Sequence, residues 1–185
     1  MRSKGIQPDL VTYNSLVQGL CNFGRGREAA TLLNEMEQRK VMPDVQTFSI
    51  LVDTLCKGGM LTEAREVFDV MIQRSIDLDI FTYNSLIDGY CLQNKLDEAV
   101  KTFNMMVEKG CSPNVFSYTI LINGYCKMTY NTLICGLCQV ERVQTALELF
   151  NTMRACGQHP NPQTYATLLD GFFKNRRIAK AMALF

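Results

Sequence analysis

The chain has 185 residues, 47% of them hydrophobic, and its 19 Lys and Arg nearly balance its 18 Asp and Glu. This balance excludes an argument from net charge for nucleic-acid, membrane or acidic partners, so any polyanion site must be built from local patterns. No apolar run approaches the ~20 residues that cross a membrane, and we expect no membrane partner.

An internal repeat dominates the sequence. Aromatic residues recur at positions 13, 48, 83 and 118, at intervals of 35, and again at 130 and 165. A fixed period in this range indicates a solenoid of stacked units. Each unit holds two runs of apolar residues at helical spacing, separated by a turn. This pattern predicts an all-α fold of helix-turn-helix hairpins, with helices of about 12 and 14 residues.

The units follow one another along the chain. Residues 1–9 read as the end of a preceding unit, and 10–44, 45–79 and 80–114 are three complete repeats. Residues 115–126 supply only the first helix of a fourth repeat, 127–161 form a complete fifth, and 162–185 form a partial sixth. Because residue 1 falls where the interior of a repeat belongs, we expect an excerpt from a longer array, with any targeting segment outside this chain.

The junction at 126–129 departs from the period. Tyr118 and Tyr130 are 12 residues apart instead of 35, so the 23 residues of a whole second helix and its turn are lacking. Either a deletion or omitted residues would explain the deficit. Because a hairpin without its second helix leaves an apolar face uncovered, we predict a local rearrangement or a gap in the chain here.

Three residue types recur with the same period and predict packing roles. Interior glycine costs about 1 kcal/mol relative to Ala in a helix, so its recurrence suggests close approach between neighbouring helices. Cysteine and methionine are soft, adaptable core residues. The recurring positions are Cys21, Cys56, Cys91, Cys126 and Cys138 and Gly19, Gly89, Gly124, Gly136 and Gly171 in the first helices, and Met36, Met71, Met106 and Met153 in the second.

The sequence contains no recognisable catalytic set. The single histidine, His159, lies beside Pro160 in a turn between repeats, and we interpret it as a solvated residue. Cys135 and Cys138 form a lone C-x-x-C without a second pair, which favours packing over a metal or redox role. We therefore predict no enzymatic activity, no cofactor and no metal.

Two repeat positions carry small polar side chains. The last residue of each unit precedes a first helix, where Asp or Asn is the preferred N-cap and needs no ligand to explain it. The fifth lies inside the helix, where Asn, Ser and Thr are mediocre helix formers. Together they could read a base edge. The fifth residues are Asn14, Ser49, Asn84, Thr119, Asn131 and Ala166, and the last are Asp44, Asp79, Asn114 and Asn161.

The repeat pattern has a familiar form. In the third unit it runs Thr-Tyr-Asn-Ser-Leu-Ile-Asp-Gly-Tyr-Cys at 82–91, Leu-Asp-Glu-Ala at 96–99 and Pro-Asn at 113–114. At a period of 35, it resembles the pentatricopeptide repeat family over essentially the whole chain, and within it the P subclass and the restorer-of-fertility-like proteins of plants. The junction at 126–129 is the main departure.

The resemblance implies a fold and a function. The fold is a right-handed superhelical solenoid that binds single-stranded RNA, one base per repeat, 5′ to 3′ from the N-terminus. The function is organellar RNA processing, stabilisation or translation, in the mitochondrion or alternatively the chloroplast, with a recruited RNA-processing enzyme as a further partner. The alternative is a protein-binding α-solenoid scaffold of the tetratricopeptide type, which shares the hairpin shape.

The resemblance also implies roles for individual residues. The family's fifth and last residues select the base, so Asn14 with Asp44 implies U, Ser49 with Asp79 implies G, and Asn84 with Asn114 and Asn131 with Asn161 each imply C, with U as the alternative. Thr119 has lost its last residue and its base is undefined, giving U-G-C-x-C. The family's second residue clamps the base, here Val11, Phe81, Phe116 and Met128. Position thirteen implies phosphate-facing lysines, here Lys57, Lys127 and Lys174.

Overall fold

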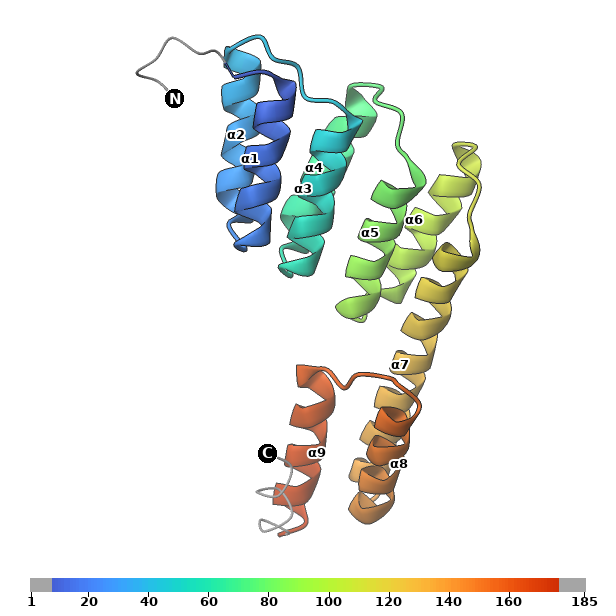
Figure 1. Ribbon diagram of the computed structural model, residues 1–185. Helices are drawn as coiled ribbons and strands as arrows, with labels where there is room; N and C mark the ends of the chain where they lie inside the picture. Colours follow the sequence, from blue (N-terminus) through green and yellow to red (C-terminus); the bar gives the residue numbers. More distant parts are fainter. Residues whose placement is uncertain (1–7, 177–185) are drawn as a thin grey trace. The chain divides into compact units, whose positions relative to one another are not determined.

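The computed structural model describes residues 8–176. They form nine α-helices and no strand, which confirms the predicted all-α fold (Figure 1). The helices are α1 (Leu10–Asn22), α2 (Gly26–Gln38), α3 (Val45–Lys57), α4 (Leu61–Gln73), α5 (Ile80–Leu92), α6 (Leu96–Glu108), α7 (Val115–Gln139), α8 (Val143–Ala155) and α9 (Pro162–Lys174). Most of the expected preceding unit and the second helix of the sixth repeat lie outside the described residues.

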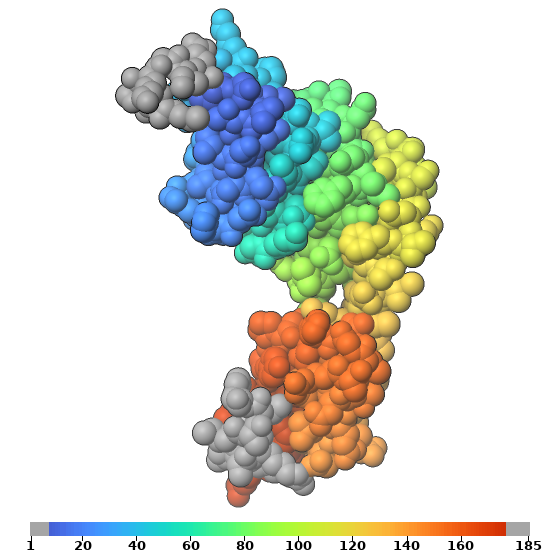
Figure 2. All heavy atoms as spheres, viewed as in Figure 1, coloured from blue at the N-terminus to red at the C-terminus, as the bar shows by residue number. Residues whose placement is uncertain are grey.

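The chain divides into two compact units, and the boundary in the sequence lies between Leu121 and Ile122. In the first unit α1 pairs with α2, α3 with α4, and α5 with α6, while α1, α3 and α5 stack on one another (Figure 1). Side chains fill the spaces between these hairpins (Figure 2). In the second unit α8 packs against α9. No helix within residues 8–176 is long and apolar enough to cross a membrane.

The helices stop where a residue adopts the left-handed conformation. Gly59 closes α3 with φ of 75° and Gly110 closes α6 with φ of 80°. Glycine is the natural choice because it has no Cβ to clash at positive φ. The same turn follows the second helices, where the carbonyls of the repeated methionines accept backbone N–H groups from Val41, Ile76, Cys111 and Gln158. These local signals produce 13-residue helices in the three hairpins formed by α1 to α6.

The periodic core residues lie where the sequence predicts them. The methionines at 36, 71, 106 and 153 are fully buried, and four cysteines, Cys21, Cys56, Cys91 and Cys138, are at most 8% exposed. Burial raises the pKa of the Cys56 thiol to about 12, with smaller contributions from Asp53 and Asp88. These thiols therefore act as small apolar side chains, and the predicted packing role is confirmed for them.

Close approach at the repeated glycine is confirmed at two positions and wrong at two others. A Cβ on Gly89 would lie 2.9 Å from Cys56 Sγ, and one on Gly171 would lie 2.7 Å from Cys138 Sγ. A Cβ on Gly19 or Gly136 would meet nothing within 4 Å. At these two positions the cysteine of one first helix thus fits against the glycine of the next.

The junction takes the form of one continuous helix. Helix α7 joins two helices that the sequence predicts as separate, the one at 115–126 and the first helix of the 127–161 repeat. The expected boundary at 126/127 therefore lies inside a helix. The predicted rearrangement therefore takes place without a gap. In a regular array, the first helix of the preceding repeat would pack against Gly136. Here that preceding helix is the N-terminal part of α7 itself, so a Cβ on Gly136 would meet nothing within 4 Å.

The missing second helix leaves its former contact face open. Ile122 is 61% exposed and Tyr125 is 48% exposed, whereas their counterparts in the third repeat, Ile87 and Tyr90, are 0% and 6% exposed. Cys126 is exposed as well, so the prediction of a core role for this cysteine is wrong. Cys56, the equivalent cysteine of the second repeat, is covered by the first helix of the next repeat. After Cys126 the next first helix is the continuation of α7 itself, so it cannot pack against this cysteine.

Candidate functional site

The last residue of each complete repeat caps the helix that follows it. Its Oδ1 accepts the backbone N–H of the residue three positions on, at 2.8 to 3.0 Å, which satisfies a donor that the helix start leaves free. The capping interpretation of this position is therefore confirmed for Asp44, Asp79, Asn114 and Asn161. The cap also places the side chain beside the preceding first helix.

In three repeats a hydroxyl connects the capping residue to the fifth residue of its own repeat. Asn14 donates from Nδ2 to Asp44 Oδ1 at 3.4 Å, and the Thr47 hydroxyl lies 2.5 Å from Asn14 Oδ1 and 2.7 Å from Asp44 Oδ1. Thr47 is the third residue of the next repeat. We call such a set, the fifth and last residues of one repeat with the third of the next, a polar triad.

Three further triads follow. In the second, Ser49 and Thr82 share a hydroxyl hydrogen bond of 2.6 Å, and Thr82 donates to Asp79. In the fourth, the Thr164 hydroxyl lies 2.6 Å from Asn131 Oδ1. The third triad contains Asn84, Asn114 and Ser117, and the fourth contains Asn131, Asn161 and Thr164.

Two of the fifth residues carry a buried amide atom without a hydrogen-bond partner. These atoms are Asn84 Oδ1 and Asn131 Nδ2. Asn84 is only 5% exposed, and the Ser117 hydroxyl of its triad bonds to Asn114 at 3.2 Å. Buried polar atoms are nearly always paired in folded proteins, so two unpaired atoms at the same repeat position mark that position as a candidate binding site.

Thr119 belongs to no triad. Its hydroxyl donates to the carbonyl of Val115 within its own helix at 2.8 Å. Thr129, which the repeat pattern would make its third-residue partner, likewise donates to Tyr125 in the same helix at 2.9 Å. The two threonines are ten residues apart on continuous α7, a rise of roughly 15 Å, and cannot meet.

An open pocket of about 450 Å³ lies beside the fourth triad. Asn131 of α7 and Gln163 of α9 both line it, together with Thr132, Cys135 and Gly136. Gln163 is the second residue of its repeat, the position for which the sequence implies a base clamp. A fifth residue and the following second residue thus share one hollow.

The implied clamp residues are exposed, but they do not occupy equivalent places. Val11, Phe81 and Phe116 lie at the second position of α1, α5 and α7 and are 71%, 50% and 61% exposed. Met128, at 39% exposed, lies in the interior of α7. The implied place for Met128 at a helix start is therefore wrong, because α7 has no start there.

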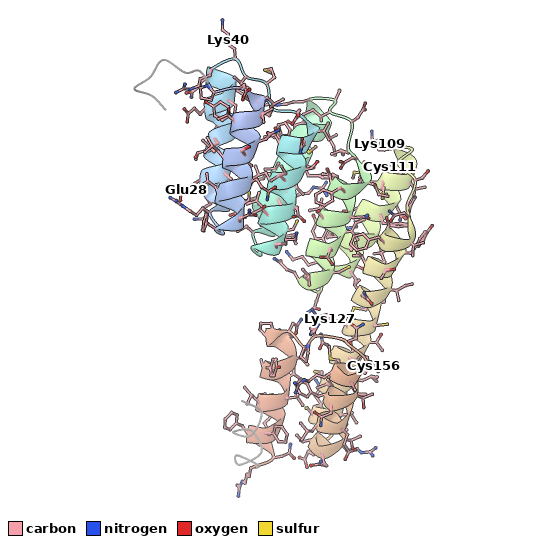
Figure 3. The ribbon with its side chains drawn as sticks, viewed as in Figure 1. Glu28, Lys40, Lys109, Cys111, Lys127 and Cys156 are labelled. Carbon is pink, nitrogen blue, oxygen red and sulfur yellow. The ribbon has the colours of Figure 1, made fainter. Side chains whose placement is uncertain are left out.

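Two of the three implied phosphate-facing lysines form ion pairs with acidic residues. Lys57 lies 2.7 Å from Asp53 and Lys174 lies 2.6 Å from Asp170, each one turn earlier on its helix. Such exposed pairs contribute little to stability and can open when a phosphate competes. Lys127, expected at the end of a first helix, lies in the interior of α7 (Figure 3).

The first triad carries a negative charge. Burial acts to raise the pKa of Asp44, but hydrogen bonds from the backbone and hydroxyl of Thr47 and from Asn14 outweigh burial, and the pKa falls below its ordinary value. Asp44 is therefore a carboxylate at neutral pH, which accepts hydrogen bonds and cannot donate one.

The residues that sequence reasoning missed are the third-position hydroxyls. Thr47, Thr82, Ser117 and Thr164 are at most 1% exposed. The three threonines bond to both positions that the pattern identified, whereas Ser117 bonds only to Asn114. A signal was present, because Thr or Ser precedes the aromatic in every repeat. Within residues 8–176 no three His, Cys, Asp or Glu side chains come together as metal ligands do.

The comparison with solved structures places this fold among known ones. It is similar to the pentatricopeptide repeat protein PPR10 from maize, with 24% identity and a TM-score of 0.58 over 99% of this chain and 24% of that one. For PPR10 in complex with an 18-nt psaJ RNA element the identity is 23% and the TM-score 0.60, over 100% and 25%. This chain therefore spans about a quarter of the PPR10 chain.

A second similar structure is the PPR domain of Arabidopsis thaliana protein-only RNase P 1 in complex with tRNA, with 17% identity and a TM-score of 0.53 over 94% of this chain and 86% of that one. No curated protein sequence matches this chain. The PPR repeat family model matches residues 8–57, 52–92, 78–127 and 128–174, and so covers nearly the whole chain. With its repeated hairpins and its sequence match, the chain belongs to the PPR repeat family.

Proposed function

We propose that this protein binds single-stranded RNA sequence-specifically, with one base at each polar triad. The observation that carries the proposal is the pair of buried amide atoms without partners, Asn84 Oδ1 and Asn131 Nδ2, at the same repeat position in the two units. An unpaired buried polar atom costs about 1–3 kcal/mol, which a complementary base edge would recover.

The proposed site follows from the residue pairs. The triads of Asn14, Ser49 and Asn84 take U, G and C in order, and the triad of Asn131 takes C. Thr119 has no triad, so the position between them is not read. The result is the proposed sequence U-G-C-x-C.

Contacts outside the triads hold the strand without reading it. Phe81 and Phe116 are exposed on the first turns of α5 and α7, where stacking on a base is worth roughly 1–3 kcal/mol. Lys57 and Lys174 would exchange their aspartates for phosphates. Because each such contact contributes only about −0.7 to the salt slope on a single strand, we expect a shallow salt dependence.

The biological role that fits this activity is occupancy of an organellar transcript, in the mitochondrion or alternatively the chloroplast. A bound solenoid would block nucleases, remodel RNA structure or recruit a processing enzyme, with no catalysis of its own. The PPR10 structure that this fold resembles was solved with an RNA element, which supports RNA as the ligand class.

The test is a binding titration with short RNAs that contain U-G-C and its single-base changes. We expect tightest binding to U-G-C, and Asn84→Ala should abolish discrimination at the third base. Asn104→Ala, the same change on the exposed face of α6, is the matched control. Equal affinity for all RNAs would refute the base assignments. RNA binding that is unchanged by Asn84→Ala would favour the protein-binding scaffold of tetratricopeptide type.

A further inference from the structure

We infer that the third-position hydroxyl of the following repeat fixes the orientation of the fifth-residue amide, and so decides whether the repeat offers a donor or an acceptor to its ligand. The part that concerns bases rests on the proposed RNA binding. The part that concerns orientation stands on the hydrogen bonds of the protein alone.

The argument starts from the single proton of the Thr164 hydroxyl. Its oxygen lies 2.6 Å from Asn131 Oδ1 and 2.8 Å from Asn161 Oδ1, and one proton can serve only one of them. Asn161 Oδ1 already accepts the backbone N–H of Thr164 at 2.9 Å. Thr164 therefore donates to Asn131 Oδ1, and Nδ2 is the atom that the Asn131 amide has left for a ligand.

The first triad has the same orientation for an independent reason. Asn14 Nδ2 donates to Asp44, which turns Asn14 Oδ1 towards the Thr47 hydroxyl at 2.5 Å. The reverse orientation would bring Asn14 Oδ1 against the Asp44 carboxylate, which accepts hydrogen bonds and donates none. Thr47 and Thr164 are 0% and 1% exposed, so water does not compete for their protons.

The third triad shows what happens when the hydroxyl bonds elsewhere. Ser117 donates to Asn114 Oδ1 at 3.2 Å, and Asn84 Oδ1 remains buried and unpartnered. Asn84 therefore offers an acceptor where Asn131 offers a donor, although both are paired with Asn. Both triads are assigned C, so the third should contact the donor of that base, its exocyclic amine, and the fourth one of its acceptors.

The experiment compares Thr164→Val, which removes the hydroxyl, with Thr164→Ser, which keeps it. Thr12→Val is the matched control, because Thr12 donates to its N-cap Asp9 in the same way, from the backbone N–H at 2.8 Å and the hydroxyl at 2.6 Å, but completes no triad among residues 8–176. The first measurement needs no RNA. It is the ¹⁵N chemical shift and order parameter of the Asn131 side-chain amide by NMR.

We expect the Asn131 amide to become mobile and shift in Thr164→Val and to stay unchanged in Thr164→Ser and Thr12→Val. An unchanged amide in Thr164→Val would overturn the inference, and so would a Thr164→Ser variant that behaves like Thr164→Val. This measurement decides the orientation even for a protein that binds no RNA.

The second measurement is base discrimination at the position taken by Asn131, with RNAs that differ only there. Thr164→Val should lower the discrimination roughly tenfold, about the worth of one hydrogen bond, and Thr164→Ser should restore it. Absence of RNA binding by the unmodified chain would refute the proposed function and leave the orientation result intact. Equal loss in Thr12→Val would assign the effect to helix capping and overturn the specificity role.

Discussion

The contact between cysteine and glycine in successive first helices can be tested with two alanine substitutions in the second unit. Gly171→Ala would place a Cβ 2.7 Å from Cys138 Sγ and 2.9 Å from Cys138 Cβ. Real Cβ atoms do not come this close, so α9 must shift away from α7. Gly136→Ala, at the same repeat position, meets nothing within 4 Å. The two variants share the chemical change and differ only in the neighbour.

The magnitudes follow from two opposing terms. Replacing an interior helical glycine by alanine stabilises by about 1 kcal/mol. Inserting a methyl group into a packed contact costs typically 1–3 kcal/mol. We therefore expect Gly136→Ala to raise the free energy of unfolding by about 1 kcal/mol. Gly171→Ala should be neutral or lower it by up to about 2 kcal/mol.

The assay is urea unfolding followed by far-UV circular dichroism, with labelling of the Cys138 thiol as a local probe identified by mass spectrometry. Gly171→Ala should speed the labelling of Cys138, and Gly136→Ala should not. Gly89→Ala and Gly19→Ala repeat the comparison in the first unit, where Cys56 is the neighbour of Gly89. Equal stabilisation by all four substitutions would refute the close approach.

Three further predictions concern the thiols, the junction and pH. The exposed Cys126 and Cys156 should react first with a maleimide. Burial raises the pKa of the Cys56 thiol to about 12, so Cys56 should react only on unfolding. Mass spectrometry of partly labelled protein would identify the order of reaction. Inserting a copy of residues 92–114 after Cys126 would restore the missing 23 residues. The insertion should protect Cys126 from labelling and raise the melting temperature. If Cys126 stayed equally reactive, the missing second helix would not be the cause of its exposure. The pKa of Asp44 is lower in the folded chain than its ordinary 3.8, so its contribution to stability is present above that value and is lost as pH falls through the folded pKa. Asp44→Asn should remove this part of the acid sensitivity, measured as urea midpoints against pH, and an unchanged profile would contradict it.

The sequence alone determined the repeated hairpins, the caps and the core. These features depend on interactions within about one helical turn or on a strict period, so residue order contains them directly. Asp79 before α5 and the buried Met71 are examples, since each needs only its local neighbours and its place in the repeat. The two polar positions of each repeat were visible for the same reason.

The tertiary structure decided what happens where the period fails. Between Cys126 and Asn131 the sequence has neither glycine nor proline, so the helix continues and two predicted helices become one. That continuity uncovers Ile122, removes the neighbour of Gly136 and leaves Thr119 without a triad. The role of the third-position hydroxyls also needed the tertiary structure, because Thr164 and Asn131 are 33 residues apart in sequence and come into contact only in the folded chain. Contacts between repeats depend on which helix lies alongside, and residue order alone does not specify that.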